Sequence, residues 1–227
     1  MTDSPQIKII SFDLDNTLYD NRPIIASAEH ESHKYLEYEF SKQGKQYSKE
    51  MFIALRKFSI KSSPIEFENL SHLRQTILDQ LCVDLDGGEL IAKEAMDLFL
   101  ARRIPQSVPT EIISMLEKLQ EKYKLVAVTN GNCEVNKMSI GKYFCKDYSP
   151  QDGYRAKPHP EMLQQILREF KISPAQLLHI GDQEDSDGKA AENADCPFIY
   201  FAPFDKSNLR EQTIQLLNRI SLRTNTG

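Results

Sequence analysis

The sequence lacks the features of several protein classes. None of its apolar runs reaches the length of about 18 residues that a membrane-spanning helix needs. Residues 1–5 are not a basic segment followed by a long apolar one, so we expect no signal peptide. Positive charge is also scarce, since the 227 residues carry a formal net charge of -5. A dedicated nucleic-acid binder usually has a basic patch, so we expect no nucleic-acid partner.

Closely spaced cysteines are lacking as well. The chain has 4 cysteines, and they form no C-x-x-C pair. Free thiols in a reducing compartment are the simplest interpretation, and a structural zinc site would need ligands closer together. With hydrophobic residues at 40% and charged residues at 27%, the composition is ordinary for a soluble globular protein. We therefore expect a cytoplasmic protein without disulfides.

What the sequence does contain divides into three parts. Residues 7–12 are a short apolar run that ends abruptly at an acid, which predicts a buried parallel strand. Up to about residue 103, apolar residues then recur at helical spacing. This spacing predicts helices over residues 24–40, 49–60, 66–82 and 89–102.

After residue 105, strand-like and helix-like segments alternate. Such alternation predicts a parallel sheet with right-handed crossovers, that is, an α/β fold with a Rossmann-like core. The predicted strands cover residues 125–128, 147–148, 177–180 and 198–201. The predicted helices cover residues 110–122, 134–143, 160–170, 187–194 and 207–220.

The order of these parts predicts an inserted domain. The first strand precedes the helical block and the other strands follow it, so the block interrupts the α/β domain. We expect a core of residues 1–20 and 105–227, with a helical cap of residues 21–104. The cap leaves the core just after Asp13 and Asp15. We therefore expect it over the carboxyl ends of the strands, where ligands bind in open α/β sheets.

Polar side chains follow the ends of the predicted strands. Because parallel strands end at one edge of a sheet, residues far apart in the sequence should meet there. Carboxylates suit Mg²⁺, which prefers oxygen ligands, and a lysine suits phosphate oxygens. The residues in question are Asp13, Asp15, Thr129, Lys157, Asp182 and Asp187.

Four motifs now carry a resemblance to a known family. They occur in order, with the helical block between the first two, and together they resemble the haloacid dehalogenase superfamily with a type 1 cap. The motifs are Asp13-Leu14-Asp15-Asn16-Thr17, Val128-Thr129-Asn130-Gly131, Lys157-Pro158, and Gly181-Asp182 through Asp187.

This resemblance implies a covalent mechanism. Asp13 would attack phosphorus and form an aspartyl-phosphate, which divides one difficult displacement into two. Asp15 would protonate the leaving oxygen and then activate water. Asp13, the backbone carbonyl of Asp15 and the carboxylate of Asp182 would hold Mg²⁺.

The resemblance also implies how the phosphoryl group is held. Thr129 and the amides of Leu14 and Asn130 would bind its oxygens, and Lys157 would neutralise charge and steady the nucleophile. Thr17 and Asp187 would support these groups without binding the metal. Asp187 would orient Lys157 or a metal-bound water, although it could instead cap the helix that follows it.

The acid at position 15 indicates the reaction type. Dehalogenases and phosphonatases of the superfamily lack an acid two residues after the nucleophile, so Asp15 favours a phosphatase. Residues 15–23 and 126–132 further resemble a bacterial subgroup. It includes the riboflavin-biosynthesis phosphatase that acts on 5-amino-6-(5-phospho-D-ribitylamino)uracil and on FMN. Gln183 and Asp195 depart from the pattern that is common in this subgroup, and neither residue has a predicted role in the reaction.

Other functions stay open at this point. A sugar phosphomutase or a nucleotidase would share these motifs. A phospho-aspartate receiver domain also uses acids, a hydroxyl and a lysine, but it has neither Asp-x-Asp-x-Thr nor a helical insertion of this size. A catalytically idle binding protein is a third possibility. We expect a small phosphorylated metabolite as substrate, and the oligomeric state is open, with a monomer compatible with the sequence.

Overall fold

The structure, a computed structural model, describes residues 6–104, 107–205 and 208–224. The predicted domain boundary at residue 105 and the predicted start of the last helix at residue 207 lie outside the described residues. The chain divides into two compact units. One comprises Met1–Asp20 with Gln106–Gly227, and the other is Asn21–Pro105.

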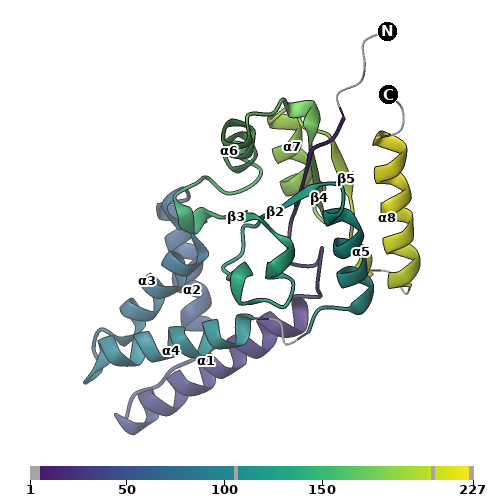
Figure 1. Ribbon diagram of the computed structural model, residues 1–227. Coiled ribbons are helices and arrows are strands. Elements are labelled where there is room, and N and C mark those ends of the chain that lie inside the picture. Colours follow the sequence, from purple (N-terminus) through teal and green to yellow (C-terminus); the bar gives the residue numbers. More distant parts are fainter. Residues whose placement is uncertain (1–5, 105–106, 206–207, 225–227) are drawn as a thin grey trace. The chain divides into compact units, whose positions relative to one another are not determined.

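The first unit contains a sheet of five parallel strands (Figure 1). Their order is β3-β2-β1-β4-β5, so the first strand of the chain lies at the centre. The predicted α/β fold with a parallel sheet is therefore confirmed. The strands are β1 (Ile9–Phe12), β2 (Lys124–Val128), β3 (Lys146–Tyr148), β4 (Leu177–Gly181) and β5 (Phe198–Tyr200).

Helices cover both faces of this sheet. On one face, α6 (Glu161–Phe170) and α7 (Lys189–Asn193) share an apolar core with side chains of β1, β2 and β4. Figure 1 shows α5 (Thr110–Gln120) beside α8 (Leu209–Thr224), and these two helices contact each other. Every residue of β1 and β4 is buried, which explains why their sequences are apolar runs without alternation.

The second unit consists of helices around a core of its own. The helices are α1 (Arg22–Lys42), α2 (Lys49–Ser62), α3 (Leu70–Cys82) and α4 (Gly88–Arg103). Their apolar faces meet in one cluster that includes Leu36, Ile77 and Ala92. Among the described helices, none combines the length and the apolar content that crossing a membrane requires.

Three predicted helices differ from the structure. The segment 134–143 forms two 3₁₀ turns, Val135–Lys137 and Gly141–Tyr143, in place of one α-helix. The chain folds back so closely that a Cβ atom at Gly141 would lie 2.4 Å from the carbonyl oxygen of Val135. Met138 between the turns is extended, with φ -86° and ψ 151°, so the helical spacing of its neighbours does not produce a helix.

The other two differences concern the starts of helices. The predicted helix 66–82 is divided because the side chain of Asn69 accepts hydrogen bonds from the backbone N–H groups of Ser71 and His72, which starts α3 there. The first two residues of the predicted helix 187–194 belong to a π-helical turn, Glu184–Gly188, and α7 follows this turn. In that turn the carbonyl of Gln183 accepts the N–H groups of residues 186–188.

Candidate active site

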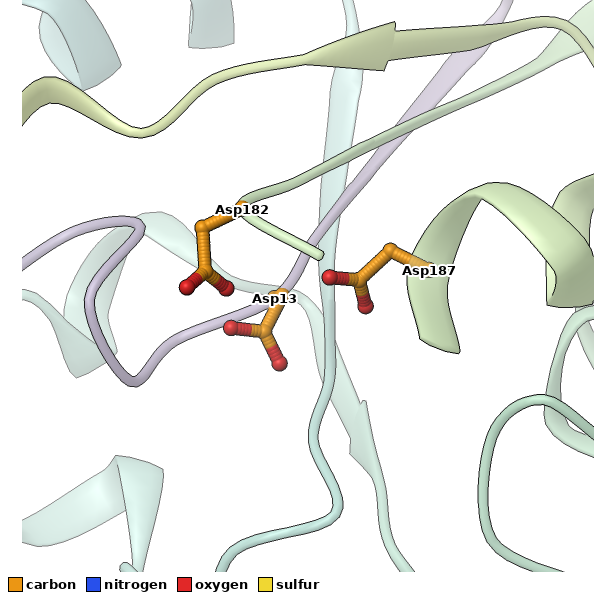
Figure 2. A group of neighbouring side chains, drawn as sticks. All are labelled: Asp13, Asp182 and Asp187. Carbon is orange, nitrogen blue, oxygen red and sulfur yellow. The ribbon is translucent and has the colours of Figure 1, made fainter. Parts of the chain in front are cut away.

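The carboxyl ends of the two central strands bring acids from distant parts of the chain together. Asp13 follows β1, and its backbone N–H donates to the carbonyl of Ile180 in β4 over 2.8 Å. Asp182 follows β4, and Asp187 lies in the π-helical turn after it. Figure 2 shows these three carboxylates approaching one another from separate segments. One oxygen from each lies within 4.8 Å of the others.

A buried lysine lies inside this group of acids. The Nζ atom of Lys157 is 2.7 Å from Oδ1 of Asp13 and 2.6 Å from Oδ1 of Asp187. It also donates to the carbonyl of Val128 over 2.7 Å. Burial alone would lower the pKa of Lys157, but the charges of Asp13 and Asp187 outweigh it and raise that pKa to about 12. Lys157 therefore stays charged.

The backbone of Lys157 is held in turn by Asn130. The Oδ1 atom of Asn130 accepts the backbone N–H of Lys157, and its Nδ2 donates to the carbonyl of the same residue, each over 2.8 Å. This pair of bonds joins the loop after β2 to the loop before α6. The predicted role of Asn130 concerned its backbone amide, and this second role of its side chain was not foreseen.

The three acids differ in how readily they lose a proton. Burial raises the pKa of Asp13 to about 7, with Lys157 opposing this rise and Asp187 adding to it. Burial, and then the charge of Asp187, raise the pKa of Asp182 to about 6. Burial would also raise the pKa of Asp187, but Lys157 and a bond from His179 outweigh it and hold that pKa below its usual range.

These acids form a donor set that suits a hard cation. Both oxygens of Asp187 accept from nitrogen, because Oδ1 contacts Lys157 and Oδ2 accepts the backbone N–H of Gln183 over 3.0 Å. Asp13 and Asp182 carry the raised pKa values, so a further positive charge beside them would favour the ionised form of both carboxylates. The residues present therefore fit a hard cation such as Mg²⁺.

The loop after β1 places the remaining residues of the first motif. The hydroxyl of Thr17 lies 3.2 Å from Oδ2 of Asp13 and 3.4 Å from Oδ1 of Asp182, so it connects the two carboxylates. The carbonyl of Leu14 accepts from the backbone N–H of Thr17, which closes a turn. Asp15 is partly exposed, and its Oδ1 accepts a hydrogen bond from the hydroxyl of Tyr19.

Thr129 lies at the end of β2, next to the central strand. Its backbone N–H donates to the carbonyl of Tyr148 over 3.1 Å. Its Oγ1 accepts the N–H of Gly131 over 2.9 Å. Because this bond uses only a lone pair, the hydroxyl proton of Thr129 is still available as a donor to a bound group.

Two polar residues behind the acids were missed in the sequence. Ser11 lies in β1 and His179 in β4, and both are fully buried. The Nδ1 atom of His179 is 2.9 Å from Oγ of Ser11, and its Nε2 is 3.4 Å from Oδ1 of Asp187. The available signal was a single polar residue within each of two apolar strands, 9–12 and 177–181.

A groove in the core unit lies away from these residues, where the strands begin. It has a volume of about 1250 Å³ and includes none of the predicted site residues. Its lining contains five lysines, all of them exposed. The site geometry therefore rests on the acids and the buried lysine, and not on this groove. The five lysines are Lys8, Lys118, Lys122, Lys124 and Lys171.

Residues 7–195 match the model of the haloacid dehalogenase-like hydrolases. The chain belongs to this family. The family, the fold and the class of hydrolases that the motifs predicted are thereby confirmed.

Members of the family with related sequences include two phosphatases. The 5-amino-6-(5-phospho-D-ribitylamino)uracil phosphatase YigB of Escherichia coli (strain K12) is 27% identical over 186 residues, covering 80% of this chain and 78% of that protein. A phosphoglycolate phosphatase of Vibrio parahaemolyticus (serotype O3:K6) is 26% identical over 198 residues, covering 84% of this chain and 81% of that protein.

A solved structure of the family is also similar. It is the 2-haloacid dehalogenase of Pseudomonas syringae pv. Tomato DC3000, with a TM-score of 0.82 and 27% identity. The alignment covers 94% of this chain and 99% of that one. Relatives of this chain thus include enzymes that act on phosphate esters and one named for carbon–halogen chemistry, so the site residues must decide between them.

Proposed function

We propose that this hydrolase is a Mg²⁺-dependent phosphatase of small phosphomonoesters, with Asp13 as its nucleophile. The observation that carries the proposal is the position of Asp13, which is buried at the end of the central strand. It contacts a charged lysine on one oxygen and approaches Asp182 on the metal side. The similarity of the chain to two phosphatases, and the acid at position 15, also support phosphate-ester hydrolysis.

In the first step, one oxygen of Asp13 forms a bond to phosphorus while the bond from phosphorus to the alcohol oxygen breaks. Asp15 gives its proton to that alcohol oxygen, and the product alcohol leaves. In the second step, Asp15 takes a proton from water, and the resulting hydroxide attacks phosphorus. The bond between phosphorus and Asp13 breaks, which releases inorganic phosphate and restores the carboxylate.

The metal would be held by the carboxylates of Asp13 and Asp182 and by the backbone carbonyl of Asp15. When bound, Mg²⁺ would offset the repulsion between the anionic nucleophile and the anionic substrate. Thr17 would keep both carboxylates in place through its hydroxyl, which lies within 3.4 Å of each. Asp187 would position Lys157 and would not bind the metal, because both of its oxygens accept from nitrogen.

Four groups would hold the phosphoryl oxygens. They are the hydroxyl of Thr129, the backbone amides of Leu14 and Asn130, and the ammonium group of Lys157. Donors at fixed positions stabilise the charge that develops during transfer without having to reorganise. The clamp between Asn130 and the backbone of Lys157 supports this arrangement, because it ties two of these donors together.

Asp15 favours a phosphatase over a dehalogenase. Cleaving a carbon–halogen bond expels a halide, which needs no proton, whereas an alkoxide leaving group does. Asp15 stands two residues after the nucleophile, and Tyr19 orients its carboxyl group. The similarity to a 2-haloacid dehalogenase therefore supports the fold and the nucleophile, and not the same substrate.

For the substrate we propose a small phosphorylated metabolite, and first 5-amino-6-(5-phospho-D-ribitylamino)uracil or FMN. The similarity to the Escherichia coli phosphatase named for the first compound supports this choice and a place in riboflavin biosynthesis. In this proposal, residues 21–104 act as a cap that excludes water during the reaction, in a cytoplasmic enzyme without a nucleic-acid partner. A phosphoglycolate phosphatase activity is the second candidate, because such enzymes are also relatives.

A panel of phosphorylated metabolites tests the proposal. The wild-type protein should release inorganic phosphate from at least one of them only when Mg²⁺ is present, and Asp13→Asn should abolish the release. A matched control is Asp185→Asn, since Asp185 is 93% exposed and is paired only with Lys189 among the ion pairs described. This control should keep wild-type activity.

Four results would contradict the proposal. Activity in Asp13→Asn would rule out Asp13 as the nucleophile. Activity that survives strong chelation would rule out a role for the metal. A long-lived acyl phosphate formed from acetyl phosphate, without turnover, would indicate a receiver. Conversion of one sugar phosphate to its isomer, without release of phosphate, would indicate a phosphomutase.

A further inference from the structure

A line of polar residues runs through the core from the middle of the sheet to the acids. Ser11 and His179 are partners in the register of β1 and β4, and the serine hydroxyl lies 2.9 Å from Nδ1 of the histidine. On its other side, Nε2 of His179 lies 3.4 Å from Oδ1 of Asp187. Both residues are 0% exposed, so each of their polar atoms needs a partner within the protein.

The chemistry of Asp187 determines where the proton of this histidine lies. Asp187 stays ionised beside Lys157 and can only accept hydrogen bonds. The proton of the neutral imidazole must therefore be on Nε2, pointing to Asp187. Nδ1 is then an acceptor. The hydroxyl of Ser11 donates to it over 2.9 Å, a shorter distance than the 3.4 Å to its other acceptor, the carbonyl oxygen of Leu178. Burial lowers the pKa of His179, which agrees with a neutral ring.

The carboxylate of Asp187 is fixed from three directions. Its Oδ1 receives Lys157 and His179, and its Oδ2 receives the backbone N–H of Gln183. It also lies against Gly181, where an added Cβ atom would come within 2.3 Å of it. Since Lys157 bridges Asp187 and Asp13, a displacement of Asp187 would move the lysine away from the nucleophile.

We propose that His179, held as the Nε2–H tautomer by Ser11, is a positioning residue that keeps Asp187 in place and thereby keeps Lys157 on Asp13. This inference rests on the proposed function, in which Asp13 is the nucleophile. His179 touches no reacting atom in this scheme. It acts through Asp187, as the outer partners of catalytic groups do, and such partners typically contribute 10- to 100-fold in activity.

Two substitutions separate the two ends of the ring. In His179→Gln, the side-chain amide nitrogen can take the place of Nε2 and still donate to Asp187. In His179→Asn, the shorter amide can replace only Nδ1 and reaches Ser11 but not Asp187. With para-nitrophenyl phosphate and Mg²⁺, we expect a kcat about ten-fold below wild type for the asparagine variant, with KM unchanged. The glutamine variant should stay within about two-fold of wild type.

Thermal unfolding and circular dichroism show whether each variant is folded, so that only folded protein is compared. A role limited to packing would lower the unfolding temperature of both variants and leave the kcat of the folded protein unchanged. The proposal is overturned if folded His179→Asn keeps the wild-type kcat. It is equally overturned if His179→Gln loses as much activity as His179→Asn.

A readout that does not depend on activity comes from the ring itself. In protein labelled with ¹⁵N at histidine, the nitrogen chemical shifts of His179 should be those of a neutral ring with hydrogen on Nε2. A ring with hydrogen on Nδ1 would overturn the inference. If Asp13→Asn proved active while the tautomer was as expected, the proposed nucleophile would fail, but the contact between His179 and Asp187 would stand.

Discussion

Each of the two units contains a buried cation paired with at least one carboxylate, but the two clusters differ in their balance of charge. In the core unit, Lys157 faces Asp13 and Asp187, with Asp182 close by, and the pKa values of Asp13 and Asp182 are raised. In the helical unit, Arg74 pairs with Glu29. Burial would raise the pKa of Glu29, but the contacts from His33 and Arg74 outweigh it and lower that pKa.

The groups that surround the two cations also differ in charge. The guanidinium of Arg74 lies 3.6 Å from the ring centre of Phe99 and 4.8 Å from that of Phe52, so aromatic faces stabilise its charge. Lys157 is surrounded by carboxylates and a carbonyl oxygen. A balanced cluster stabilises its unit, whereas a cluster with excess negative charge is suited to binding a cation. Four predictions test this comparison.

The largest effect is expected from Lys157→Met. The substitution leaves Asp13 and Asp187 without their shared cation, so activity should fall by at least about a thousand-fold. The free energy of unfolding should fall by about 3–5 kcal/mol, because two buried carboxylates lose their partner. Phosphate release and urea unfolding measure the two effects. Activity near that of the wild type would show that the lysine does not serve the site.

The second largest effect is expected in the pH dependence of Mg²⁺ binding. The pKa values of Asp13, about 7, and Asp182, about 6, are raised, so both groups take up protons as the pH falls through those values. Protons then compete with the metal, and the Kd for Mg²⁺ should rise at least about ten-fold between pH 8 and pH 5.5. Calorimetric titration measures it. A constant Kd over this range would contradict the assignment of the two ligands.

A smaller effect is expected from Thr17→Val, which replaces the hydroxyl with a methyl group of similar size. The change removes the hydroxyl, whose single proton is within reach of both carboxylates. A hydrogen bond to a charged group contributes about 1.5 kcal/mol, so Mg²⁺ should bind about ten-fold more weakly. Thr17→Ser keeps the hydroxyl and should bind the metal as the wild type does. Equal affinities in both variants would mean that Thr17 does not hold the ligands.

The helical unit provides the contrasting case, Arg74→Met. Glu29 loses its cation but is partly exposed, so the free energy of unfolding should fall by only about 2 kcal/mol. The affinity for Mg²⁺ should not change, since Arg74 belongs to the balanced cluster. The same calorimetric titration checks this. A weaker affinity for Mg²⁺ in folded Arg74→Met would contradict the proposed difference between the two clusters.

The acids of the site could be predicted because of where they stand in the sequence. Asp13 and Asp182 each end an apolar run, and a parallel sheet brings such ends together whatever the loops do. The bond between Lys157 and Asp13 could be expected only through the order of the motifs. The segment 134–143 was predicted wrongly, because its turns depend on a close backbone approach at Gly141 that helical spacing does not reveal.

Ser11 and His179 could not be identified in the same way. Within a buried strand, a serine or a histidine looks like a tolerated exception among apolar neighbours. Their importance depends on the register of β1 against β4, which places them opposite each other. The local sequence is enough to predict each strand. The register between the strands, however, depends on two segments separated by 168 positions.

The clamp of Asn130 on the backbone of Lys157 has a consequence for how the site can change over time. Because one side chain both donates to and accepts from a residue 27 positions away, the two loops must shift together or break two hydrogen bonds at once. Loops of an enzyme usually vary independently, but these two are constrained as a pair. An insertion in either loop would have to keep Asn130 and the backbone of Lys157 at hydrogen-bonding distance. Altered substrate preference should therefore arise elsewhere in the chain.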